Sequence, residues 1–165
     1  MLTANKLRKV VVLGVGNLLL QDEGVGVHVI QALEGTTPPE ATSLEIIDGG
    51  TLPDMVPLAG VDKLIVVDAV KGGGKPGSVY RFHPEDISLE RGTATSLHQL
   101  NLLENLGIME HLGQKPAEVV IIGVEPEEIT WGLELSPRLQ QCLPRIVEVV
   151  NGEIRSLPRE RSEKR

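Results

Sequence analysis

Residues 9–26 read KVVVLGVGNLLLQDEGVG, and this stretch decides the fold. The β-branched run after Lys9 stops at Gly14, which predicts a strand buried on both faces of a sheet. A glycine-containing loop follows, and apolar residues then recur at helical spacing up to Leu33. Asp22 stands just before that helix and is a candidate N-cap. A buried strand, a loop and a helix in this order indicate an α/β fold.

The rest of the chain repeats this alternation. We expect further strands at 44–47, 63–67, 78–82 and 118–123, and helices at 54–58, 96–106 and 136–151. The last helix has the clearest end signals, with Ser136 as N-cap, Pro137 in its first position and Gly152 after its end. The strand at 78–82 follows a loop too short for a helical crossover, so it is expected to run antiparallel to the other strands. The pattern predicts a three-layer α/β fold with a ligand site at the carboxyl ends of the first and third strands.

Length and composition suit a single domain. We expect residues 1–152 of the 165 to form one α/β domain, and the charged segment 153–165 to be a tail. The formal net charge of −7 argues against sequence-independent nucleic-acid binding. No apolar run approaches the roughly 20 residues of a membrane-spanning helix. The single cysteine, Cys142, fits a reducing cytosol, so we expect a cytoplasmic protein that binds neither nucleic acid nor membranes.

The glycines of the first loop do not match a nucleotide-binding fingerprint. Gly14 and Gly16 begin the pattern G-x-G-x-x-G, but Leu19 occupies the position of the third glycine. No Gly-Lys-Ser/Thr follows, so the loop is not a Walker loop either. Two carboxylates, Asp22 and Glu23, would also repel a phosphate there.

Acidic residues stand where the first three expected strands end. Glu23 follows the loop after the first strand, Asp48 closes the second strand and Asp68 closes the third. Each also has a simpler explanation. Glu23 suits the first turn of a helix, Asp48 suits a turn before two glycines, and Asp68 suits a cap.

One histidine joins this group. His98 comes two residues after Ser96, the expected N-cap of a helix, and a helix N-terminus favours the neutral imidazole that binds metals. Two carboxylates and one imidazole suit a borderline divalent ion such as nickel or zinc, with coordination positions left open for catalysis. The simpler explanation of His98 is a first-turn residue that only packs or is solvated.

The other histidines and the cysteine carry weaker signals. We expect His28, His83 and His111 to be surface or packing residues, and Cys142 to pack beside the apolar face of the last helix. A Gly-x-Ser-x-Gly nucleophile elbow does not occur in the sequence.

Six short blocks of sequence carry a family resemblance. They are Gly14-x-Gly16-Asn17-x-Leu19-x-x-Asp22-Glu23-Gly24-x-Gly26, Asp48-Gly49-Gly50-Thr51, Val67-Asp68-Ala69, Ser96-x-His98-Gln99, Gly123-Val124-x-Pro126 and Gly132-Leu133-x-Leu135-Ser136-Pro137. In this order they resemble the endopeptidases that mature the large subunit of nickel–iron hydrogenases.

The resemblance implies a fold, a site and a substrate. The implied fold is an α/β/α sandwich with a mixed five-stranded sheet, order 2-1-3-5-4, in which strand 4 is antiparallel. Glu23, Asp68 and His98 are the implied nickel contacts, and Asp48 is a further acidic position tied to function. The nickel is already inserted in the precursor, so no permanently bound cofactor is expected. The protease recognises that nickel and removes a C-terminal extension, and we expect it to act as a monomer.

Two points stay open on the sequence alone. Water is activated either by nickel or by a carboxylate, Asp48 or Asp68, acting as general base. The same three ligands would also serve a nickel-sensing chaperone that docks on the precursor and cuts nothing. A nucleotide-binding α/β domain is a third hypothesis.

Overall fold

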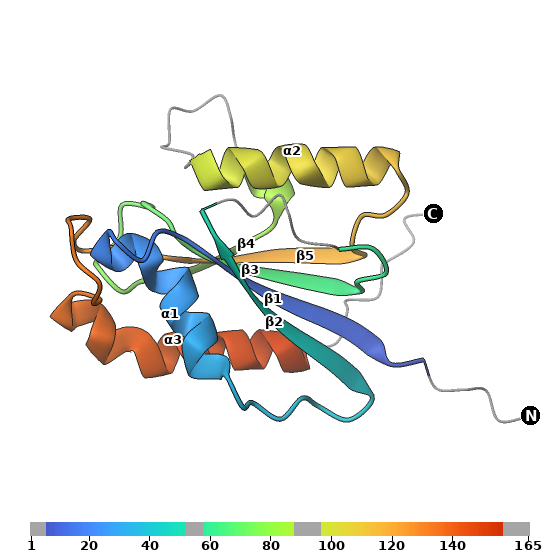
Figure 1. The fold of residues 1–165 in the computed structure, drawn as a ribbon, viewed down its shortest axis with the longest axis horizontal. Helices are drawn as coiled ribbons and strands as arrows, with labels where there is room; N and C mark the ends of the chain where they lie inside the picture. Colours follow the sequence, from blue (N-terminus) through green and yellow to red (C-terminus); the bar gives the residue numbers. More distant parts are fainter. Residues whose placement is uncertain (1–5, 52–57, 88–96, 157–165) are drawn as a thin grey trace, which may run out of the picture.

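Five strands form one mixed sheet that carries helices on both faces (Figure 1). The computed structural model describes residues 6–51, 58–87 and 97–156. The strands are β1 (Arg8–Val15), β2 (Thr42–Gly50), β3 (Lys63–Ala69), β4 (Val79–Phe82) and β5 (Glu118–Val124). The helices are α1 (Val25–Leu33), α2 (Leu97–His111) and α3 (Pro137–Arg155), with short 3-10 helices η1 (Gln21–Gly24) and η3 (Pro84–Asp86).

The sheet has the order β2-β1-β3-β5-β4, as expected. β1 pairs in parallel with β2 and β3, and β3 pairs in parallel with β5. β4 runs antiparallel to β5, because the loop that returns the chain from β3 is too short for a helical crossover. In Figure 1 the carboxyl ends of the parallel strands lie on the left, together with η1 and the segment between β5 and α3. The predicted three-layer α/β/α fold is confirmed.

Alternate residues of each strand build two separate cores. Along β1, Val10 and Val12 pack on the face of α1 and α3, whereas Val11 and Leu13 pack on the face of α2. Every one of these four side chains is fully buried, which explains why the strand is apolar on both faces. The same alternation decides which face of the sheet each strand-end carboxylate occupies.

Three helix ends differ from the expectation, one in each of the α-helices. α2 continues through Gly107 to His111, because Met109 beyond the glycine still packs against the sheet. α1 begins at Val25 after η1, and Asp22 does not cap it. The helix expected at 54–58 lies almost wholly outside the described residues, and the cap Ser96 lies outside them. Of the helices in the described ranges, none is both long and apolar enough to span a bilayer.

α3 also continues past its expected end at Gly152, so the expected boundary between domain and tail falls inside the helix. Ile154 is 2% exposed and Glu153 is 8% exposed, which shows that the last turn packs on the sheet. The charged composition of residues 153–165 predicts a tail, but Glu153 forms an ion pair inside the domain, with Lys63.

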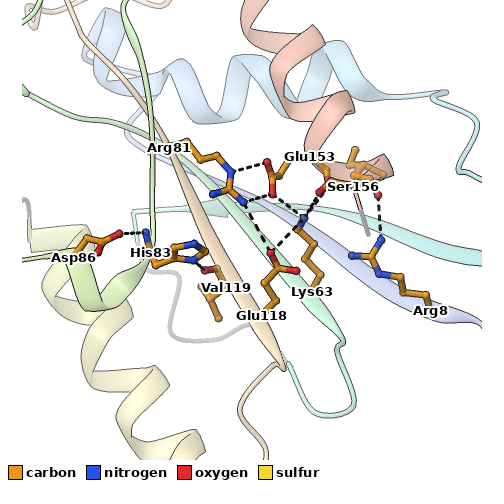
Figure 2. Close-up of polar contacts among 10 residues, drawn as sticks. Arg8, Lys63, Arg81, His83, Asp86, Glu118, Val119, Glu153 and Ser156 are labelled. Atoms are coloured by element: carbon orange, nitrogen blue, oxygen red, sulfur yellow. Dashed lines mark hydrogen bonds and ion pairs between the residues drawn. The ribbon is translucent and has the colours of Figure 1, made fainter. Parts of the chain in front are cut away.

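Glu153 lies in a charge cluster at the amino edge of the sheet, in which Lys63 and Glu153 are buried and Arg81 is partly exposed (Figure 2). Lys63, fully buried at the start of β3, donates from Nζ to Glu153 Oε1 at 2.7 Å and to Ser156 Oγ at 2.8 Å. Arg81 of β4 donates from Nε and Nη2 to the two Glu153 oxygens, each at 2.9 Å. These bonds, that from Arg81 foremost, lower the pKa of Glu153 to about 2. These bonds attach the C-terminal end of α3 to β3 and β4.

Candidate active site at the carboxyl edge of the sheet

Close packing of glycines holds the loop after β1 against the sheet. A Cβ on Gly16 would lie 2.0 Å from the backbone oxygen of Glu23, and a Cβ on Gly26 would lie 2.1 Å from that of Val67. Neither position admits a side chain without moving backbone. Gly16 therefore lets η1 approach the end of β1, and Gly26 lets α1 approach the end of β3, which η1 also contacts. The glycines of this loop serve packing between backbones, in keeping with their mismatch to a nucleotide fingerprint.

Two of the predicted ligands come from these neighbouring elements. Glu23 is half-buried in η1, and its backbone N–H donates to Leu20 O at 3.2 Å. Asp68, near the end of β3, is 3% exposed, and its Oδ1 accepts the N–H of Ala69 at 2.8 Å. Asp68 shares the strand parity of Leu64 and Val66, so it belongs to the face of the sheet that α2 covers.

The third predicted ligand begins the helix on that same face. The backbone of His98 lies in the first turn of α2, whose N-terminal end is on the side of the carboxyl edge in Figure 1. The side chain of His98 is outside the described part of the structure. Among the side chains that are described, no group of three or more His, Cys, Asp or Glu lies close enough to hold a metal ion.

Asp48, the remaining predicted site residue, lies on the other face. It pairs with Gly14 of β1 and shares the parity of Leu44 and Ile46, which pack on the face of α1 and α3. Its exposed carboxylate accepts the N–H of Gly50 at 2.8 Å, the contact that its turn interpretation predicts. β1 lies between β2 and β3, so the backbones at Asp48 and Asp68 are about 10 Å apart, which is two strand spacings. The structure therefore places Asp48 apart from Asp68, one of the predicted nickel contacts.

Asp22 has a role that its position before a helix did not indicate. Its side chain is fully buried and accepts four hydrogen bonds from the segment between β5 and α3. The donors are the N–H groups of Glu127 at 2.9 Å and Glu128 at 2.8 Å, and the N–H and hydroxyl of Ser136, both at 2.8 Å. Asp22 therefore fastens the loop to this segment, whereas the adjacent Glu23 is only half-buried.

Glu125 is a strand-end carboxylate that the sequence analysis missed. It follows β5 and is 8% exposed, and its Oε2 accepts the N–H of Gly72 at 2.6 Å and the hydroxyl of Tyr80 at 2.8 Å. Burial and the Glu125 carboxylate raise the pKa of Tyr80. These bonds shape the glycine-rich loop between β3 and β4. Its position after an apolar strand, like that of Asp68, was the available signal.

The other histidines and Cys142 fit packing or surface roles, as expected. His83 contacts Val119 O through Nδ1 at 3.0 Å, and His111 is exposed. His28 lies beneath the segment that Asp22 fastens, and burial lowers its pKa, although a hydrogen bond to the Leu133 backbone opposes that effect. Cys142 packs half-buried against the core.

The chain is an α/β sandwich with buried carboxylates near its carboxyl edge, and the loop after β1 does not match a nucleotide-binding fingerprint. Comparison with known proteins makes the class specific. A family model described as hydrogenase maturation protease matches residues 27–153, which include Asp48, Asp68 and His98. The chain belongs to the hydrogenase maturation protease family, and it is an endopeptidase of that family. Membership favours the enzyme over the chaperone and the nucleotide-binding domain.

Individual relatives are similar in sequence to this chain along most of its length. Hydrogenase 2 maturation protease of Escherichia coli strain K12 is 34% identical over 164 residues, covering 92% of this chain and 97% of that protein. The hydrogenase expression/formation protein HupD of Thiocapsa roseopersicina is 35% identical over 147 residues, covering 86% of this chain and 65% of HupD. This chain therefore spans about two thirds of the length of HupD.

A solved structure of a relative has a similar fold. The hydrogenase maturating endopeptidase HybD from E. coli superposes with a TM-score of 0.74 at 31% identity, over 89% of this chain and 92% of that chain. This chain has the fold of that endopeptidase.

Proposed function

We propose that this endopeptidase removes the C-terminal extension of a nickel–iron hydrogenase large-subunit precursor after nickel has been inserted. The observation that carries the proposal is the placement of Asp68, an almost fully buried carboxylate near the end of β3, beside the η1 helix that bears Glu23. A carboxylate withdrawn from water at a sheet's carboxyl edge is typical of a functional group.

The precursor's own nickel is the recognition element in this proposal. Glu23 and Asp68 offer carboxylates and His98 offers an imidazole, a set that suits a borderline divalent ion. Three ligands at most leave the ion's remaining positions to the precursor, so the protease detects the metal without removing it. Affinity for the precursor then rises only when nickel is present, and cleavage becomes a checkpoint.

Asp68 is the better candidate for general base. Hydrolysis needs a water whose oxygen attacks the scissile carbonyl while a base takes its proton and later returns it to the leaving amine. Asp68 occupies the face of the sheet that α2 covers, whereas Asp48 is exposed on the opposite face. Nickel bound to the precursor lowers the pKa of the attacking water.

The test is mass spectrometry of the precursor after incubation with the protein, with and without nickel. The nickel-loaded precursor loses a C-terminal peptide, and the nickel-free precursor does not. Glu23→Gln, Asp68→Asn and His98→Gln abolish cleavage, while Glu45→Gln, an exposed change on β2, leaves it intact. Equal cleavage of both precursor forms contradicts nickel recognition, and binding with no loss of mass supports a chaperone instead.

The proposal places the enzyme in the cytoplasm as a monomer. The single cysteine, Cys142, suits a reducing compartment. Sedimentation of the purified protein checks the monomer.

A further inference from the structure

Four exposed apolar side chains belong to two segments that backbone hydrogen bonds join, the loop after β1 and the segment between β5 and α3. They are Leu19, Ile129, Trp131 and Leu133, with 51%, 38%, 80% and 67% of their surface exposed, and we call them the Trp131 patch. Trp131 is the single tryptophan of the chain. Contiguous apolar surface with a polar rim is typical of a site for another molecule, and tryptophan is the residue most enriched in binding hot spots.

The patch is held in place by backbone contacts. Leu20 and Gly132 form a parallel bridge, in which Gln21 donates its N–H to Gly132 O and Gly132 donates to Leu19 O, each at 2.9 Å. This bridge joins the loop after β1 to the segment between β5 and α3, and the buried carboxylate of Asp22 fastens that segment at both ends. A preorganised surface loses less conformational entropy when it binds.

An acidic cavity adjoins the patch. It has a volume of about 620 Å³, and its lining includes Gln21, which also contacts Gly132. Three glutamates line it, Glu127, Glu128 and Glu134, against one arginine, Arg138. Such a cavity attracts a cationic side chain. Two copies of this chain, each with a net charge of −7, would bring their acidic rims together, so self-association is disfavoured.

We propose that the Trp131 patch and the acidic cavity form a docking site for an apolar segment of the hydrogenase precursor that carries a lysine or arginine beside it. The site is separate from the residues that contact nickel, and the inference rests on the proposed function. Leu19 of the patch and Glu23 of the candidate active site belong to the same loop, four positions apart. A segment bound on the patch is thereby kept next to the residues that act on the scissile bond.

The experiment measures the Kd for the nickel-free precursor, which the proposed function leaves uncut, and kcat/KM for the nickel-loaded precursor. Trp131→Ala tests the patch, and its control is Leu7→Ala, a residue 57% exposed just before β1 at the amino edge. The triple variant Glu127→Gln, Glu128→Gln, Glu134→Gln tests the cavity. Its control, with the same change in charge, is Glu34→Gln, Glu40→Gln, Glu45→Gln, at exposed positions on or near α1 and β2.

We expect Trp131→Ala to weaken both quantities about tenfold or more, and the controls to stay within about twofold of the parent. Added salt weakens binding by the parent, and it has less effect on the cavity variant. Values for Trp131→Ala within twofold of the parent overturn the docking site and leave the proposed function standing. The docking site is also overturned if the parent is a dimer and Trp131→Ala dissociates that dimer without changing the Kd for the precursor.

The remaining outcomes separate the two proposals. A parent that binds the precursor and cuts neither form overturns the proposed function, and the docking site is then judged by Kd alone. A parent that neither binds nor cuts the precursor overturns both.

Discussion

The carboxylate of Asp22 accepts both the backbone N–H and the hydroxyl of Ser136, each at 2.8 Å, across 114 positions of sequence. Ser136 is at the same time the N-cap of α3, since its Oγ accepts the N–H of Leu139 at 3.5 Å. One buried carboxylate therefore links the loop that carries Glu23 to the start of the last helix. The geometry of the candidate active site depends on this link.

Asp22→Ala is expected to destabilise the fold by about 3–5 kcal/mol, because it leaves several buried donors without an acceptor. Glu23→Gln, one residue along, changes stability by less than about 1 kcal/mol, since Glu23 is only half-buried, but it abolishes processing. Urea unfolding measures the first effect and the precursor assay the second. If Asp22→Ala is as stable as the parent, the four hydrogen bonds do not fasten the segment in solution.

Gly26→Ala is expected to cost more than about 3 kcal/mol or to displace α1, because the new Cβ meets backbone oxygens of Val67 and Val15 at 2.1 and 2.4 Å. Gly152→Ala in α3 is the matched control. A Cβ there meets nothing within 4 Å, and alanine favours a helix, so this variant gains about 0.5–1 kcal/mol. Thermal unfolding compares the two. If both variants change the stability equally, the backbone around Gly26 moves to accept the new Cβ with little loss of stability.

The fold was largely predictable because β1, β3 and β5 are short apolar runs interrupted near their carboxyl ends by glycine or aspartate. Parallel strands buried on both faces need such runs, and the brief loop before β4 left only an antiparallel pairing. Helix ends were harder. Gly107 and Gly152 are helix breakers by propensity, but contacts of Met109 and Glu153 beyond them outweigh roughly 1 kcal/mol of propensity.

The site was predictable only in part, for a physical reason. Residues that follow parallel strands meet at one edge, so Glu23 and Asp68 were expected together there. Spacing along the chain does not reveal which long-range donors a carboxylate will find. The bonds of Asp22 to the segment before α3 and of Glu125 to the loop before β4 appear only once the chain is folded. Strand parity, which separates Asp48 from Asp68, needed the observed packing of each strand.

His28 makes stability fall as the medium is acidified. Burial lowers its folded-state pKa below the ordinary 6.5, so the unfolded chain takes up a proton first when the pH drops below 6.5. Stability is full above that value and declines as the pH falls toward the folded-state pKa. We expect His28→Gln to flatten the dependence of the urea midpoint between pH 7.5 and 5, whereas His111→Gln, at an exposed position, leaves it as in the parent. An unchanged slope in His28→Gln would show that other groups carry the effect.

Glu153 governs stability in stronger acid. Its folded-state pKa is about 2, below the ordinary 4.5, because Arg81 and Lys63 hold the charged form. Between these values the unfolded chain binds more protons than the folded one. The stabilisation is therefore complete above pH 4.5 and is lost as the pH falls toward 2. The difference between the unfolded-state pKa of 4.5 and the folded-state pKa of about 2 corresponds to on the order of 3 kcal/mol in the free energy of unfolding.

Glu153→Gln removes that stabilisation at every pH, and it leaves the buried Lys63 with only its longer ion pair to Glu118, at 3.7 Å. We expect a loss of about 3–5 kcal/mol at pH 7 and a flatter stability curve between pH 4.5 and 2. Glu148→Gln is the control, because it is an exposed glutamate of the same helix, and it should reproduce the parent curve. The measurement is the free energy of unfolding from urea titrations at pH 7, 4.5 and 3. A steep acid limb that persists in Glu153→Gln would assign the transition to other carboxylates, and the cluster in Figure 2 would then contribute packing and little charge stabilisation.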